Sequence, residues 1–208
     1  MGIAERKERE KEDVRRKILD AAHDLFETQG YENVTMRAVA DAIEYSPTTI
    51  YLHFASKDAL VEALCFEDFG RLSEAMNRAP LPRNPVDRIR ALGRAYAAFG
   101  LANPNHYRFM FMTTGDWKKH ANEVDSPPAR SYAVLRQAVV EAIDQGLFAK
   151  NDVDLVSQIL WSAIHGVVSL VITFKPEQFP RAPPRPGLVE ASIEATLQGL
   201  LVGREDKA

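Results

Sequence analysis

Apolar residues recur along this chain at intervals of three and four, which is the spacing of one buried face of an α-helix. The first row begins at Val14 and runs to Gly30, a residue that can end a helix. The charged residues before Val14 are expected to form a frayed, solvated lead-in. Further rows predict helices over residues 36–43, 47–52, 57–77, 86–102, 105–113, 129–145, 153–174 and 189–201. No alternating strand pattern competes with them, so the sequence predicts an all-α fold without internal repeats.

Hydroxyl side chains stand where three of these helices are expected to begin. Thr35, Ser46 and Ser56 can each accept a hydrogen bond from an unpaired backbone N–H of the first turn. Pro47 follows Ser46 at the first helical position, where its missing N–H costs nothing. The proline-rich run at 80–85 cannot lie inside a helix and marks the first strong break. These signals predict a compact N-terminal unit of short helices, followed by a larger helical bundle.

The segment at 153–174 is long and apolar enough to cross a bilayer. However, Gln158, Ser162, His165 and Ser169 recur at steps of four, three and four, which gathers them on one helix face. We therefore expect a buried helix in a soluble bundle rather than a membrane span.

Composition and charge say little about the function of the chain or its binding partners. The chain has 208 residues, 46% of them hydrophobic, with a formal net charge of −3 and a pI near 6.0. The first 60 residues hold nine Lys and Arg against twelve Asp and Glu, so any nucleic-acid surface must be a narrow one. The N-terminus has neither the apolar core of a signal peptide nor the composition of a transit peptide, and the expected location is the cytoplasm.

Signals for catalysis and for metal binding are missing from the sequence. It has no HExxH or GxSxG motif, no phosphate-binding glycine loop, and no compact group of histidines and carboxylates at ligand spacing. Cys65 is the single cysteine, and His23, His106 and His120 are most simply surface residues. We therefore predict no enzyme activity, no cofactor and no metal site.

Residues 35–52 have the pattern of a helix-turn-helix, whose second helix would enter the major groove of DNA. Its leading hydroxyls, on Ser46, Thr48 and Thr49, can contact phosphates or base edges. Residues Tyr51, His53 and Lys57 are spaced to reach one backbone strand. The apolar residues Ile50 and Phe54 would pack this helix onto the unit.

The stretch "GYENVTMRAVADAIEYSPTTIYLHFASKDALVEAL", from Gly30 to Leu64, resembles the DNA-binding domain of TetR-family transcriptional regulators. The resemblance implies a set of phosphate contacts and a set of groove contacts. The phosphate set is Thr35, Tyr51, His53 and Lys57, and the groove set is Ser46, Pro47, Thr48 and Thr49. Arg37, at the start of a helix, is expected to add positive charge to the same surface.

The chain departs from the family pattern at two positions. Where the family often has glycine between the two helices this chain has Glu44, so either the turn shifts by one residue or Glu44 is strained. Where many members have glycine in the second helix this chain has Thr48, which should alter the bases that are read.

Two later stretches, "PNHYRFMF" and "LWSAIHGVVSL", resemble the ligand-binding half of one TetR subgroup. The resemblance assigns an apolar pocket to the segments that carry these residues. The expected lining is Phe69, Tyr96, Phe99, Tyr107, Met110, Trp117 and Trp161, with His165 and Ser169 as polar groups. The alternative is that these rings only fill a core.

The interpretation that combines these observations is a ligand-responsive, TetR-type repressor. An N-terminal three-helix domain, residues 10–58, would bind a palindromic DNA operator, and a helical bundle, residues 59–208, would dimerise and hold a small apolar effector. The alternatives are an all-α interaction or scaffold protein that keeps the helix-turn-helix as structure, and then an all-α enzyme. The sequence names neither the effector nor the operator.

Overall fold

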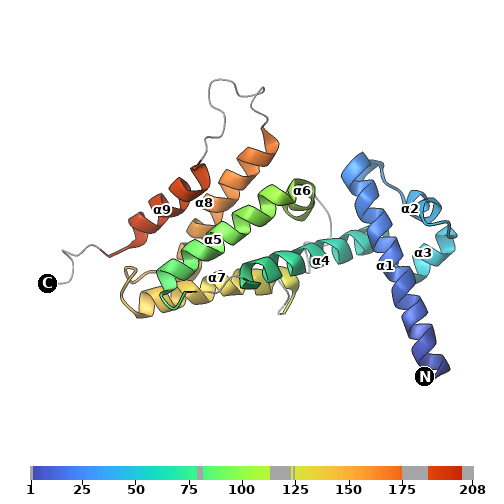
Figure 1. The fold of residues 1–208 in the computed structure, drawn as a ribbon, viewed down its shortest axis with the longest axis horizontal. Helices are drawn as coiled ribbons and strands as arrows, with labels where there is room; N and C mark the ends of the chain where they lie inside the picture. The colour runs from blue at the N-terminus through green and yellow to red at the C-terminus, as the bar shows by residue number, and fades with distance from the viewer. Residues whose placement is uncertain (1, 79–81, 113–122, 124, 175–186, 203–208) are drawn as a thin grey trace. The chain divides into compact units, whose positions relative to one another are not determined.

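A computed structural model describes residues 2–78, 82–112, 123, 125–174 and 187–202. Its elements, in chain order, are α1 (Ile3–Gln29), the 3-10 helix η1 (Tyr31–Asn33), α2 (Met36–Ala42), α3 (Pro47–His53), α4 (Lys57–Arg78), α5 (Pro85–Ala102), α6 (Pro104–Met112), α7 (Pro127–Asp144), α8 (Val153–Thr173) and α9 (Leu188–Leu200) (Figure 1). Among the described residues the only extended pairing is an isolated bridge between Phe148 and Leu201. The all-α prediction is confirmed.

The predicted helix ends agree with the structure to within two residues, except at the N-terminus. Helix α1 begins at Ile3 rather than near Val14, so the prediction of a frayed lead-in was wrong, although its side chains are largely exposed as expected. The charges that suggested fraying instead support a helix. Glu5 accepts a hydrogen bond from the Gly2 backbone N–H, and Arg6 pairs with Glu10 one turn later at 2.7 Å.

The chain forms two compact units. Unit 1 contains Met1–Asp68 and Asn105–Ser126, and unit 2 contains Phe69–Pro104 and Pro127–Ala208. Helices α1, α2, α3 and most of α6 belong to unit 1, whereas α5, α7, α8 and α9 belong to unit 2. Helix α4 is continuous through the division at Asp68. The functional boundary expected after residue 58 stays a prediction.

Unit 1 is organised by its capping residues and a small apolar core. Thr35 accepts a hydrogen bond from the Ala38 N–H at 3.1 Å, and Ser46 accepts one from the Thr49 N–H at 3.2 Å. Ser56 caps α4 in the same way, as predicted. The buried side chains of this core come from α1, α2, α3 and the residues that flank them: Ile18, Leu19, Ala22, Val34, Val39, Ile50 and Phe54.

Unit 2 is a bundle in which α5 and α8 each pack against both α7 and α9 (Figure 1). Its central side chains are fully or almost fully buried: Leu92, Ala138, Val139, Ala142, Val156, Val168 and Leu197. A Cβ added to Gly93 would lie 3.2 Å from the Ile193 side chain, so this glycine permits the close approach of α5 and α9. Arg94 of α5 pairs with Glu190 of α9 at 2.7 Å along the same contact.

Helix α8 is buried on one side only. Within the described part of the chain it alone has the length and hydropathy to cross a membrane, and a third of its most apolar stretch is buried. Val156, Leu160 and Ile164 lie in the bundle, whereas Leu155 and Ile159 remain exposed. The prediction of a helix packed in a bundle is therefore correct for one face, and the other face is an uncovered apolar row that also includes Leu170.

The turn between α2 and α3 settles the question raised by Glu44. Its φ angle is +59°, in the left-handed region that glycine adopts freely and other residues adopt at a cost. The turn has therefore not shifted, and Glu44 occupies the strained position. Its side chain is exposed, so no packing compensates for the strain.

We predict that Glu44→Gly raises the free energy of unfolding by about 0.5 to 1 kcal/mol, because relief of the left-handed backbone outweighs the extra freedom of an unfolded glycine. Urea denaturation followed by circular dichroism measures the change. Glu44→Ala is the matched control, since it removes the charge and keeps the Cβ. Equal stabilisation by both variants would attribute the effect to charge rather than to backbone strain.

Candidate functional site

Helix α3 presents a polar, solvated face while its opposite side is buried. Ile50 is fully buried and Phe54 is 3% exposed, whereas Tyr51 is 53% exposed. Ser46, Pro47 and Thr48 at the leading end are all exposed. The geometry therefore divides α3 into a packing side and an accessible side, as the sequence predicted.

The hydroxyls at the leading end of α3 are not equivalent. The Thr49 and Ser46 side-chain oxygens lie 3.0 Å apart and hydrogen-bond to each other, and Ser46 also caps the helix. Thr48 is exposed and points a hydroxyl and a methyl group outward. Of the predicted groove residues, Thr48 has the side chain best placed to contact a base edge.

Leu52 is a surface residue that the sequence analysis did not assign. Its side chain is 77% exposed on α3, next to Tyr51, although leucine at this position suggests packing. An exposed apolar group on this face can contact a thymine methyl. The helical spacing of the sequence could have predicted this exposure, since Leu52 lies two positions from buried Ile50 and two from the buried C-cap residue Phe54, and therefore on a different face.

The two predicted basic side chains of this surface, Lys57 and Arg37, differ in their contacts with the rest of the protein. The Lys57 ammonium donates to the Tyr31 backbone carbonyl at 2.5 Å and lies 4.0 Å from the centre of the Tyr31 ring. The Arg37 side chain is 82% exposed and makes one long contact with Asp41, at 3.9 Å. Arg37 is therefore the more available of the two, and Lys57 has its remaining N–H donors for a phosphate.

The remaining predicted phosphate contacts are polar groups that carry no charge at pH 7. Burial is the largest cause that lowers the pKa of His53 below its ordinary value of 6.5, and the positive charges of nearby Lys11 and Arg15 lower this pKa further. A neutral His53 can donate one N–H but adds no positive charge. The Thr35 hydroxyl accepts the capping bond and keeps its own hydrogen for an outside acceptor.

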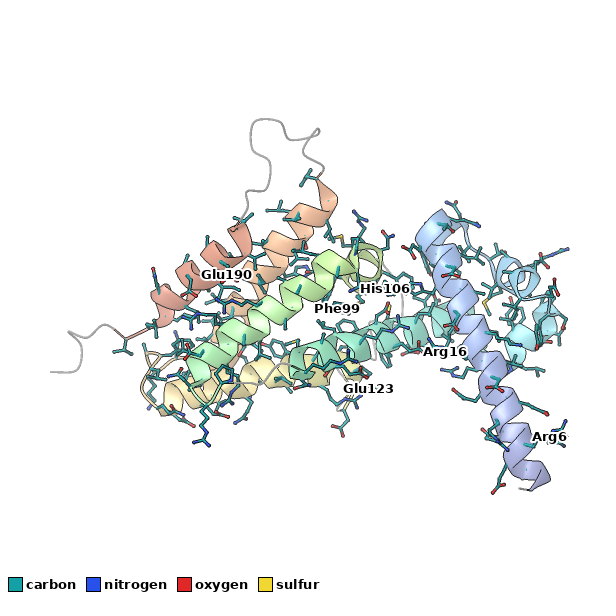
Figure 2. All side chains as sticks on the ribbon, viewed as in Figure 1. Arg6, Arg16, Phe99, His106, Glu123 and Glu190 are labelled. Carbon is teal, nitrogen blue, oxygen red and sulfur yellow. The ribbon has the colours of Figure 1, made fainter. Side chains whose placement is uncertain are left out.

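The predicted ligand-binding residues are distributed between the two units. Phe69, Tyr96, Phe99, Trp161, His165 and Ser169 belong to unit 2. Tyr107 and Met110, both buried, belong to unit 1. Trp117 lies outside the residues that the structure describes. Figure 2 shows Phe99 on α5, where it is partly buried.

In unit 2 the structure joins three predicted ligand residues into one polar network. The Tyr96 hydroxyl on α5 lies 2.9 Å from Nδ1 of His165, and Trp161 Nε1 donates to the same hydroxyl at 3.2 Å. Burial lowers the pKa of His165, so its imidazole is neutral at pH 7. Two helices thus supply a hydroxyl, an imidazole and an indole to one place.

Ser169 lies one turn further along α8 than His165. Its hydroxyl oxygen is buried, and within the described part of the chain it has no hydrogen-bond partner. Because a buried hydroxyl without a partner costs free energy, such groups are often completed by a water or a ligand. Ser169 therefore remains the second polar group of the predicted pocket.

Two family descriptions match separate parts of the chain. Residues 18–64 match "Bacterial regulatory proteins, tetR family", and residues 89–198 match "Tetracyclin repressor-like, C-terminal domain". The second match alone covers more than half of the chain.

Individual proteins show the same similarity. HTH-type transcriptional regulator UidR of Escherichia coli K12 is 37% identical over 59 residues, which are 28% of this chain and 30% of UidR. HTH-type transcriptional repressor Rv1474c of Mycobacterium tuberculosis is 42% identical over 67 residues, covering 32% of this chain and 36% of that protein. The chain thus matches about a third of the length of these curated relatives.

The similarity in fold extends over most of the chain. The crystal structure of a putative tetR family transcription regulator from Shewanella sp. PV-4 superposes with a TM-score of 0.68 at 18% identity. The superposition covers 91% of this chain and 98% of that one. At this identity the likeness concerns the fold.

We predict that His165 makes the protein less stable in mild acid. The pKa of His165 is lower in the folded than in the unfolded chain, so below about pH 6.5 the unfolded state binds the extra proton and the free energy of unfolding falls. Unfolding in urea at pH 7.5 and at pH 5.5 measures the loss, which should be smaller in His165→Gln. An equal loss in both proteins would show that other groups cause it.

Proposed function

The chain belongs to the TetR family of bacterial regulatory proteins, and we propose that it is a repressor that binds a palindromic operator as a homodimer. In this proposal a small apolar effector binds the C-terminal bundle and releases the DNA. The protein acts in the cytoplasm and needs no catalytic residue. The proposal depends most on one observation: Thr48, Tyr51 and Leu52 are exposed on α3, while Ile50 of the same helix is buried.

DNA binding by α3 is supported by the division of its faces. The exposed hydroxyls and the Leu52 side chain can reach base edges, whereas Tyr51, Arg37 and His53 can reach phosphates. Arg37 supplies the accessible positive charge, and the net charge of the chain is negative, so nonspecific affinity should be modest. The repressor assignment is supported by Rv1474c, which is named a repressor.

Dimerisation is supported by the apolar surface of unit 2. Leu155, Ile159 and Leu170 form an exposed row on α8. Helix α9 carries small residues, Ala195 and Gly199, at exposed positions that allow close packing against a symmetry mate. Two copies of α3 in such a dimer would address half-sites about 34 to 36 Å apart, which predicts a palindromic operator.

Effector binding is supported by the polar network of unit 2. Tyr96, Trp161 and His165 offer oriented hydrogen-bonding groups on aromatic side chains, and Ser169 adds a buried hydroxyl. All of these groups are uncharged at pH 7, which suits an apolar or weakly polar ligand better than a polyanion. An effector that favours one arrangement of the two DNA-binding units would shift the population of dimers away from DNA. Helix α4 takes part in both units and is the natural connection.

Selection of binding sites from random duplexes tests the proposal directly. We predict that the wild-type protein enriches a palindrome, and that Thr48→Ala changes the preferred bases, with about 1 to 3 kcal/mol of discrimination lost per affected base pair. Tyr51→Phe is the matched control, because loss of a phosphate contact weakens binding to all sequences about equally. No enrichment by folded wild-type protein would favour the alternative of an interaction protein with a structural helix-turn-helix.

We predict that apolar aromatic compounds quench Trp161 and release the operator, whereas phosphorylated compounds do neither. The measurement uses Trp117→Phe protein, in which the quenched fluorescence comes from Trp161 alone. Tyr96→Phe should weaken the ligand about tenfold through loss of one hydrogen bond. Tyr132→Phe is the control, since the Tyr132 ring contacts Trp161 but its hydroxyl, which interacts with the Asp154 carbonyl at 3.5 Å and with Ser157, is not one of the proposed ligand-binding groups. Quenching and release by polyanions alone would contradict an apolar pocket.

A further inference from the structure

Unit 1 brings together two histidines and an aspartate that are far apart in the sequence. Nδ1 of His106 on α6 lies 2.8 Å from Nε2 of His23 on α1 and 2.8 Å from Oδ1 of Asp68 on α4. The two histidines are 83 positions apart in the sequence. All three ligand atoms lie within 4.8 Å of one another (His106 is labelled in Figure 2). Neither the helix-turn-helix nor the ligand network of unit 2 uses this cluster.

Hydrogen bonding alone does not satisfy the contacts of His106. A ring nitrogen carries at most one hydrogen, yet Nδ1 of His106 faces two polar atoms at the same distance. If Nδ1 donates to Asp68, it has no second hydrogen for a full bond to His23. If it accepts from His23, its lone pair faces the Asp68 carboxylate oxygen. A cation among the three atoms would attract all of them at once.

The aspartate supplies a buried oxygen ligand to the cluster. Asp68 is only 1% exposed, and a carboxylate this deeply buried is stabilised by a cation or a metal ion. The His106 side chain is also largely buried, and its ring centre lies 3.9 Å from that of His23. Neutral imidazoles are the form that binds metal ions.

We propose that His23, Asp68 and His106 form a binding site for a divalent transition-metal ion such as Zn²⁺. Two imidazoles and one carboxylate are a ligand set for Zn²⁺, Co²⁺ or Ni²⁺, whereas Mg²⁺ and Ca²⁺ prefer oxygen ligands alone. This proposal departs from the sequence analysis, which predicted no metal site and treated both histidines as surface residues. The ion would join α1, α4 and α6 within unit 1.

The distances need only a small change to accept the ion. With bonds of about 2.0 to 2.1 Å, tetrahedral ligand atoms lie about 3.3 Å apart, compared with 2.8 Å for the two close contacts here. The rings are inclined to each other by 35°, and a rotation of one imidazole would point both nitrogens at the ion. Metal ions compete with protons for imidazole and carboxylate ligands, so affinity should fall as the pH is lowered.

The surroundings provide access and an open coordination position. A cavity of about 310 Å³ in unit 1 is lined by both histidines. Its other walls include Glu27, Asn105 and Arg108, so it is polar enough to hold water or a small anion beside the ion. Three protein ligands with one position open toward a cavity is the arrangement in which zinc binds an exchangeable ligand.

Metal titration of the untagged, full-length protein tests the site. We expect the wild-type chain to bind one Co²⁺ per protomer with a visible absorption spectrum typical of mixed nitrogen and oxygen ligands, and Zn²⁺ to displace it. Zn²⁺ should also raise the melting temperature at pH 7.5 and have less effect at pH 5.5. The variants His23→Gln and Asp68→Asn should each lose at least about 100-fold in Co²⁺ affinity, since even residues beyond the ligands contribute 10- to 100-fold.

The matched control is Asp24→Asn, which removes an exposed carboxylate next to His23 in the chain. Its affinity should equal that of the wild type. His23 is only partly buried, so His23→Gln should fold, and circular dichroism verifies this. The proposal is overturned if the wild type binds Co²⁺ no better than folded His23→Gln. It is equally overturned if stability depends on pH but not on Zn²⁺, because the cluster would then bind protons only.

Discussion

Burial of one side of α3 is the constraint on which the proposed DNA-binding surface depends. A helix of seven residues is too short to be stable in water by itself. It exists here because Ile50 and Phe54 are buried in unit 1 and because Ser46 and Pro47 form a favourable first turn. The same anchoring fixes which residues face outward. Any change that loosened Ile50 would therefore disturb Thr48, Tyr51 and Leu52 together, even though Ile50 itself cannot reach DNA.

Unit 2 uses helix contacts to hold polar groups in an apolar environment. The close approach of α5 and α9 at Gly93, together with the Arg94–Glu190 pair, fixes α5 in the bundle. Tyr96 follows on α5, and α8 brings Trp161 and His165 to its hydroxyl. Because burial keeps His165 neutral, the network is a set of oriented dipoles rather than charges. This is the physical basis for expecting an uncharged effector.

The histidines of the two units therefore have different surroundings. In unit 2 one partly buried imidazole lies beside a tyrosine hydroxyl and a tryptophan ring. In unit 1 two imidazoles converge beside a buried carboxylate, which favours a positive ion. A regulator with both features would have two places at which small molecules or ions could act, one in each unit. The continuous helix α4 carries Asp68 and extends into both units.

Local sequence determined the helices, their capping residues and the strained turn, because these depend on residues within about four positions of one another. Thr35, Ser46 and Gly30 act as their neighbours in the chain predict, and Glu44 is strained for the same local reason. The resemblance to the TetR family was likewise visible in one continuous stretch. The sequence analysis did not predict the N-terminal turns of α1, although oppositely charged residues four positions apart there, such as Arg6 and Glu10, are typical of a helix.

Tertiary structure decided the contacts between residues that are distant in the chain. Lys57 is held by Tyr31, 26 positions away, and His23 meets His106 across 83 positions. No periodic pattern encodes such pairs, because they depend on how separate helices pack and on the rotamers that packing allows. Leu52 is exposed for a related reason, since Ile50 and Phe54 take the places in the core. The sequence thus determined which side chains are present on each helix, and packing determined which of them meet.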